Sequence, residues 1–146
     1  MIKQIYKEIV ISAPVSQVWN AWTVKEELIK FFAPDAEIDL RIGGKYEMFF
    51  LLDNPPGTKG GEGNRILSFV PHKMLSFEWN APPQFTNVRK EKTWCVLLFD
   101  EIEQDTTKIR FYQLGWREGK EWDEVYDYFQ EAWDYVFNNL KKYFQK

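Results

Sequence analysis

The sequence predicts an α+β fold: a strongly curved, seven-stranded antiparallel sheet wrapped around one long C-terminal helix, with two short helices after the first strand. Two observations support this fold class. Residues 121–145 contain neither Gly nor Pro and repeat apolar side chains at helical spacing, whereas residues 36–115 read as strands separated by turn signals. A lone amphipathic helix must bury its apolar face, so we expect the sheet to curve around it. At 146 residues, a single domain over residues 1–146 is expected.

The predicted final helix, residues 121–145, is long enough to cross the whole domain, because such a helix measures about 38 Å. Acidic residues dominate its first half and lysines its end, which suits the helix dipole. At 100° per residue, most of its apolar side chains share one sector, which widens to an arc of roughly 140° when all are counted. The narrow sector holds Trp122, Val125, Phe129, Ala132, Trp133, Val136, Leu140 and Tyr143.

The remaining elements follow from turn and capping signals. Residues 3–12 predict the first strand, and residues 15–22 a short amphipathic helix. Thr23 and Glu26 have the spacing of a capping box, which would start a second short helix that ends before Pro34. Further strands are expected at 38–41, 45–52, 65–70, 74–79, 91–104 and 108–115, with Gly/Pro-rich or polar loops at 53–63 and 80–90.

Alternation along the strands predicts which side chains face the helix. Both faces of residues 94–99 are apolar, so a register slipped by one residue remains open there. The expected inward residues are Tyr46, Met48, Leu75, Phe77, Trp79, Leu97, Phe99, Ile109 and Phe111.

Composition limits the classes of function. A net charge of −3 offers little attraction for DNA, RNA or anionic lipid. Cys95 is the only cysteine, which excludes an intramolecular disulfide and favours a reducing compartment. No stretch reads as a signal peptide or a membrane span, so a cytoplasmic location is expected. The 12 Phe, 7 Tyr and 7 Trp residues indicate a large core, a pocket or an interface.

No catalytic or metal motif is found. One His and one Cys cannot build a His/Cys zinc site, and no Ser lies in a Gly-x-Ser-x-Gly elbow. His72 reads as a solvated turn residue and Cys95 as a buried, inert thiol. The glycines of loop 53–63 lack the ending of a phosphate loop. No catalytic residue, metal or cofactor is therefore expected.

Charged residues within the strands are the remaining route to chemistry. Glu47, Arg65, Glu78 and Arg110 interrupt strands and are expected to point outward. One that pointed inward would be a desolvated polar anchor inside an apolar pocket.

Several motifs together resemble a known superfamily. They are Ala13-Pro14 followed by Val18-Trp19, the turn over residues 41–46, residues 75–79, Gly115-Trp116, Trp122, Phe129 with Trp133, Leu140 and Tyr143. Their order and spacing resemble the START-like (helix-grip, SRPBCC) superfamily and, within it, the family named for the activator of the heat-shock-protein-90 ATPase. The resemblance runs from about residue 5 to 145. It implies a mostly apolar cavity between sheet and helix that accepts hydrophobic small molecules in many relatives, but it supplies no catalytic motif.

The candidate ligand-binding residues are the aromatic and aliphatic side chains expected around that cavity. The same residues could simply fill a core, because burying each contributes about 1.5–3 kcal/mol with or without a ligand. The loops at 53–63 and 80–90 are expected at the mouth, where they could act as lids. The candidates are Trp22, Phe32, Tyr46, Met48, Phe77, Trp79, Leu97, Phe99, Phe111, Val125, Phe129 and Trp133.

Three hypotheses about function follow. The leading one is a binding protein for a small hydrophobic or aromatic molecule held between the sheet and the final helix. The second, implied by the narrower family, is a chaperone-accessory or stress-related interaction module. The third is an enzyme, such as a cyclase or hydrolase, acting on an apolar substrate. Tyr128 and Tyr135 flank the apolar arc, so a monomer or a homodimer is compatible with the sequence.

Overall fold

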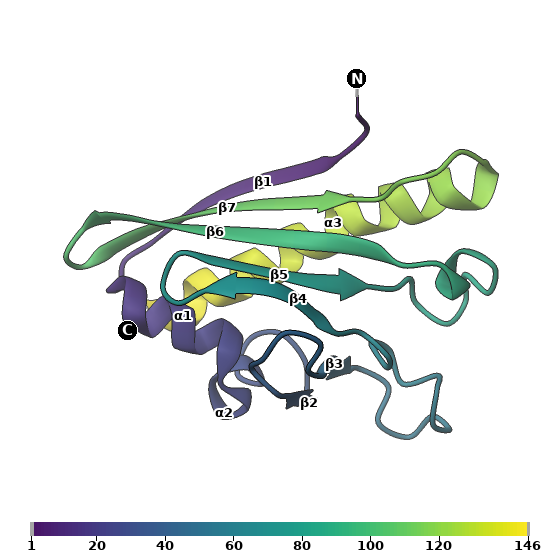
Figure 1. The fold of residues 1–146 in the computed structure, drawn as a ribbon, viewed down its shortest axis with the longest axis horizontal. Coiled ribbons are helices and arrows are strands. Elements are labelled where there is room, and N and C mark those ends of the chain that lie inside the picture. Colours follow the sequence, from purple (N-terminus) through teal and green to yellow (C-terminus); the bar gives the residue numbers. More distant parts are fainter. Residues whose placement is uncertain (1, 146) are drawn as a thin grey trace.

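The computed structural model describes residues 2–145. Strands form an open curved sheet, and the long C-terminal helix α3 lies across one face of it (Figure 1). The C-terminal end of α3 lies beside the two short helices, where the Tyr143 hydroxyl donates to the Glu27 carboxylate. The elements are β1 (Ile5–Ile11), α1 (Val15–Thr23), α2 (Lys25–Leu28), β2 (Asp35–Ile38), β3 (Tyr46–Phe49), β4 (Ile66–Val70), β5 (Met74–Trp79), η1 (Val88–Lys90), β6 (Thr93–Glu103), β7 (Thr106–Leu114) and α3 (Lys120–Phe144).

The predicted seven antiparallel strands are present, arranged in two ladders. Five strands pair in the order β1-β7-β6-β5-β4, and β2 pairs with β3. Isolated bridges join Lys45 to Arg65 and Phe49 to Gly60, so the short ladder continues the curve of the larger sheet. The helix-grip fold class is therefore confirmed.

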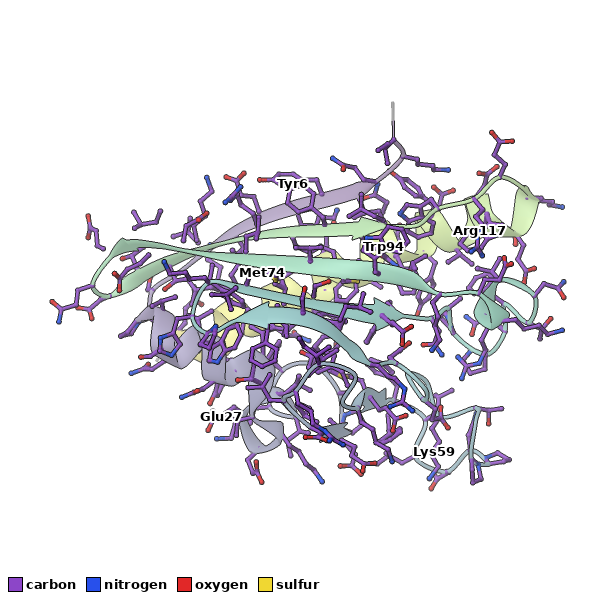
Figure 2. All side chains as sticks on the ribbon, in the orientation of Figure 1. Tyr6, Glu27, Lys59, Met74, Trp94 and Arg117 are labelled. Atoms are coloured by element: carbon purple, nitrogen blue, oxygen red, sulfur yellow. The ribbon has the colours of Figure 1, made fainter. Side chains whose placement is uncertain are left out.

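The register places the predicted apolar side chains against α3. Leu75, Leu97 and Phe111 are opposite one another on β5, β6 and β7, and all three are fully buried. All nine side chains expected to face inward are at most 5% exposed. Residues 94–99 take the predicted register, with Trp94 on the outer face. Figure 2 shows Trp94, Met74 and Tyr6 along that outer face.

The helix α3 begins and ends within one residue of its predicted bounds. Its buried side chains are Trp122, Val125, Phe129, Trp133, Val136, Phe137 and Leu140. The apolar arc is thus the face that packs on the sheet.

Three local predictions were wrong. The second strand is Asp35–Ile38 and not 38–41, because residues 41–44 form a turn in which the Gly43 N–H donates to the Ile66 carbonyl. The third strand ends at Phe49, because the next two backbone N–H groups donate to the Lys59 carbonyl. The capping box does not form: the Thr23 hydroxyl donates to the Trp19 carbonyl at 2.8 Å, which keeps Thr23 within α1.

The charged strand residues point away from the core, as expected. Arg110 donates to Asp100 at 2.7 Å, Glu47 accepts from the Gly63 N–H, and Glu78 accepts from the Arg65 N–H. None of Glu47, Arg65, Glu78 and Arg110 is buried. Within residues 2–145, no helix has both the length and the apolar character that crossing a membrane requires.

Candidate functional site

An open cleft of about 720 Å³ lies beside the middle of α3. One wall is the helix from Tyr128 to Val136. The other wall is built by residues 50–51, 60–61 and 80–84, which belong to or adjoin the two loops expected at the mouth. Trp79 and Phe32 line it as well. The cleft therefore lies between α3 and the loops that follow β3 and β5.

The floor of the cleft is a cluster of four aromatic rings. Trp79 and Trp133 lie 5.5 Å apart between ring centroids, inclined at 44°. Phe32 packs against both, at 5.6 and 5.7 Å, and Phe129 lies 6.2 Å from Trp133. All four side chains are at most 7% exposed. Mutual packing fixes the orientation of these rings, so the floor is preorganised.

A buried chain of hydrogen bonds connects the Trp133 indole to the backbone of Trp79. The Trp133 indole N–H donates to Gln113 Oε1 at 2.8 Å, and Gln113 Nε2 donates to Thr93 Oγ1 at 2.9 Å. The Thr93 hydroxyl in turn donates to the Trp79 carbonyl at 3.1 Å. Gln113 is fully buried and Thr93 is 4% exposed. Since a buried polar group without a partner is costly, this relay ties the position of one tryptophan to the other.

The rim of the cleft is also apolar, but exposed. Phe50 and Leu51 form one side, with 40% and 44% exposure, and Tyr128 and Tyr135 form the other, with 42% and 68%. Phe85 packs edge-on against Tyr128 at 5.8 Å and thereby joins the second loop to α3. Large apolar side chains that gather around a concave site commonly mark a binding surface.

Two charged residues organise the loops. The Glu62 carboxylate accepts the backbone N–H groups of Gly57, Lys59 and Gly60. The Arg89 guanidinium donates to the carbonyls of Gly57, Gly60 and Ala81, at 2.6 to 2.9 Å, and lies 3.6 Å from Glu62. Arg89 therefore fastens the loop at 53–63 to the loop at 80–90.

Electrostatics at this junction favour a charged Glu62. Burial raises the pKa of its carboxyl, but the backbone N–H donors outweigh burial and hold that pKa below the usual 4.5. Position 60, whose backbone N–H donates to Glu62, requires glycine. Its φ is +140°, and a Cβ there would lie 2.7 Å from the Phe50 ring.

A second hollow of about 550 Å³, lined mainly by polar and charged residues, shares Asn80 and Pro83 with the cleft. Arg89, Lys90 and Lys92 line this hollow together with Glu62. Lys92 donates to Asn64 Oδ1 at 2.7 Å, and Asn64 donates to Asn80 Oδ1 at 3.1 Å. Burial is the main cause that lowers the pKa of Lys92.

The structure divides the twelve sequence-predicted site residues into two groups. Phe32, Trp79, Phe129 and Trp133 line the cleft. The other eight do not line it and are at most 5% exposed within the packed core, so their role as ligand contacts stays a prediction. These eight are Trp22, Tyr46, Met48, Phe77, Leu97, Phe99, Phe111 and Val125.

Sequence reasoning missed several residues that build the site. Gln113 continues the inward alternation of Ile109 and Phe111, so a polar residue at a core position was a readable signal. Glu131 lines the cleft although it belongs to the polar side of the helix. Glu62 and Arg89 carried no signal, because their partners are backbone groups brought close only by the fold.

The residues weighed for chemistry lie apart from the cleft. Cys95 is fully buried, and burial raises the pKa of its thiol well above the usual range, which disfavours the reactive thiolate. His72 occupies a turn at φ 64°, and its ring lies edge-on to Trp19 at 6.2 Å. Among residues 2–145, no group of three His, Cys, Asp or Glu side chains is placed to hold a metal ion.

A curved antiparallel sheet that grips a long C-terminal helix, with an aromatic cleft beside that helix, defines a START-like, helix-grip domain. The family model described as "Activator of Hsp90 ATPase homolog 1-like protein" matches residues 12–145, and the chain belongs to this family. A comparison with curated proteins finds no match.

Several solved structures share this fold. A protein from Mesorhizobium loti has a TM-score of 0.77 at 18% identity, covering 96% of this chain and 95% of its own. The Aha1 dimer from Colwellia psychrerythraea has a TM-score of 0.74 at 19% identity, with coverage of 99% and 97%. An Hsp90 activator from Plasmodium falciparum has a TM-score of 0.72 at 15% identity, with coverage of 94% and 92%. At these identities the likeness concerns the fold.

Proposed function

We propose that the protein binds a small apolar molecule with a flat or aromatic ring system in the cleft beside α3. The observation that carries this proposal is the preorganised floor of Trp79, Trp133, Phe32 and Phe129 beneath an exposed apolar rim. The cleft volume of about 720 Å³ falls within the usual range for small-molecule sites. Family membership agrees with this function, since many START-like relatives accept hydrophobic ligands.

The expected affinity is modest. A two-ring probe that buries about 250 Å² of apolar surface gains roughly 6 kcal/mol before the costs of association are subtracted. At about 0.3 kcal/mol of net binding free energy per non-hydrogen atom, a probe with about 12 such atoms has a dissociation constant on the order of 1 mM. Isothermal titration calorimetry measures binding in this range.

The test uses 1-naphthylmethanol, a neutral two-ring probe, with the native protein and two variants at Ala132. Ala132 lines the cleft between Phe129 and Trp133 on α3. We expect Ala132→Phe to obstruct the aromatic floor of the cleft and abolish binding, and Ala132→Ser, the matched control, to bind as the native protein does. Circular dichroism would verify that both variants are folded. Absence of binding to the native protein, or unchanged binding by Ala132→Phe, would refute the proposal.

A second candidate function is an interaction with an Hsp90-class chaperone, favoured by the family match over residues 12–145. In this role the surface of the domain, rather than the cleft, would contact the chaperone. A pull-down with the chaperone and its ATPase rate at saturating protein test this role. An unchanged rate together with no co-purification would remove it. Ala132→Phe separates the two functions, because it blocks the cleft and leaves the surface away from it intact.

An enzymatic role would require polar groups that converge on the bound molecule. In the part of the chain that the structure describes, Glu131 is the only charged residue lining the cleft. A binding function is therefore better supported than catalysis.

We further propose a cytoplasmic location, since the single cysteine is a buried thiol. The protein would act as a monomer or as a homodimer. A homodimer contact through Tyr128 and Tyr135 would cover the rim of the cleft. Sedimentation velocity with and without the naphthyl probe would distinguish these states, because a ligand that occupies the rim would compete with such a dimer.

A further inference from the structure

The charges around the cleft are unequally distributed. Of its described lining residues, Glu131 alone carries a formal charge, and no Lys or Arg lines it. The neutral polar side chains are Asn80, Gln84 and the two rim tyrosines. A ligand in this cleft therefore meets one carboxylate and otherwise aromatic, aliphatic or amide groups.

Glu131 lies between the two exposed tyrosines of the rim. It follows Tyr128 by three residues and precedes Tyr135 by four, and side chains at these spacings share one face of a helix. Both tyrosines and Glu131 are exposed at the mouth, above the buried indole of Trp133. The faces of aromatic rings attract cations, and a nearby carboxylate adds to that attraction.

The basic residues Arg89, Lys90 and Lys92 line the second hollow and not the cleft. Arg89 donates to the carbonyls of Gly60 and Ala81, and its guanidinium lies 3.6 Å from Glu62. Lys92 donates to Asn64 in the second hollow, and Lys90 lines that hollow as well. Because these three basic side chains line the second hollow and not the cleft, they are poorly placed to pair with an anion bound in the cleft.

We infer that the cleft selects apolar ligands that carry a positive charge, such as protonated aryl-alkyl amines, over neutral and anionic ligands of the same shape. This inference rests on the proposed binding function and names the ligand class of the same site. The apolar body packs on the floor of Trp79 and Trp133, while the ammonium group lies at the rim beside Glu131, Tyr128 and Tyr135.

The test compares three naphthyl probes that differ in charge: 1-naphthylmethylamine, 1-naphthylmethanol and 1-naphthylacetate. Calorimetry at neutral pH is expected to give the order amine, alcohol, carboxylate, with the amine binding about tenfold more tightly than the alcohol. Glu131→Gln is expected to weaken binding of the amine about fivefold and binding of the alcohol by much less, since only the amine carries a charge. Asp127→Asn removes one charge from the same helix outside the cleft lining and is the matched control.

Salt supplies an independent measurement. Raising the salt concentration from about 0.01 M to about 1 M shortens the screening length from about 30 Å to about 3 Å. The advantage of the amine over the alcohol should therefore shrink in the native protein and change little in Glu131→Gln.

The outcomes separate the inference from the function on which it rests. Equal binding of the three probes, or tightest binding of the carboxylate, overturns the charge preference and leaves the proposed binding function standing. An equal loss of amine affinity in Glu131→Gln and Asp127→Asn also overturns it, because the effect would then come from the net charge of the helix. Binding of none of the probes overturns the binding function and the inference together.

Discussion

Gln113 offers the most direct test of how the floor of the cleft is held. It is fully buried, accepts the Trp133 indole N–H at 2.8 Å and donates to Thr93 at 2.9 Å. Gln113→Met has a similar volume, so it removes both hydrogen bonds with little change in packing. An unpaired buried indole N–H costs about 1–3 kcal/mol, and the lost bond to Thr93 about 1 kcal/mol. The expected fall in the free energy of unfolding is therefore about 2–4 kcal/mol.

Urea denaturation followed by circular dichroism measures this free energy, and a double-mutant cycle assigns its cause. Trp133→Phe removes the indole N–H itself, so no donor is left unpaired when Gln113→Met is added. We expect the double variant to be more stable than the sum of the single effects by about 1–3 kcal/mol. Additive effects, or a Gln113→Met variant whose free energy of unfolding lies within about 0.5 kcal/mol of that of the native protein, would refute the reasoning.

Binding of 1-naphthylmethanol should also weaken in Gln113→Met, since Trp133 loses the hydrogen bond that orients its indole ring.

Two further predictions concern the loops. Arg89→Met should raise the rate of amide hydrogen exchange at residues 57–61, because the loop loses its hydrogen bonds to Arg89. It should also lower probe affinity about threefold to tenfold, because a freed loop must be ordered again on binding. Lys90→Met is the control, and equal effects of the two variants would contradict this role of Arg89. The pKa of Glu62 is depressed in the folded protein, so its contribution to loop stability is present above the usual pKa of 4.5 and is lost as pH falls through the lower folded pKa. The test is the protection of the amides of residues 57–60 against hydrogen exchange, measured by NMR from neutral pH to about pH 3. Protection should fall at low pH in the native protein and should not change with pH in Glu62→Gln. Equal pH profiles of the two proteins would show that the carboxylate does not hold the loop.

Much of the fold could be predicted because its signals are local. Alternation along a strand has a period of two residues and depends only on which face meets the core, so the burial of Leu75, Leu97 and Phe111 was correctly predicted. The bounds of α3 followed from an uninterrupted helical period. The capping box failed because the Thr23 hydroxyl had a competing acceptor, the Trp19 carbonyl one turn earlier.

The candidate site was less predictable because it depends on contacts between distant segments. Phe32, Trp79, Phe129 and Trp133 were named from the sequence, but nothing local distinguished them from the eight candidates that the core encloses. The Gln113 relay joins β6, β7 and α3, and the Arg89 contacts join two loops about thirty residues apart. Such partners become visible only when the chain is folded.

The sequence by itself determined the class of fold, the amphipathic final helix and the apolar character of the surface on which it packs, because each depends on the periodicity of hydrophobic side chains along a short stretch. Only the tertiary structure decided where that packing stops. Sheet and helix close completely around Phe77, Leu97 and Phe111, whereas beside Trp133 the second wall consists of loops that leave an open cleft. The physical reason is that burial depends on the apolar pattern, while a cavity depends on the path of the loops and on the long-range hydrogen bonds that hold them in place.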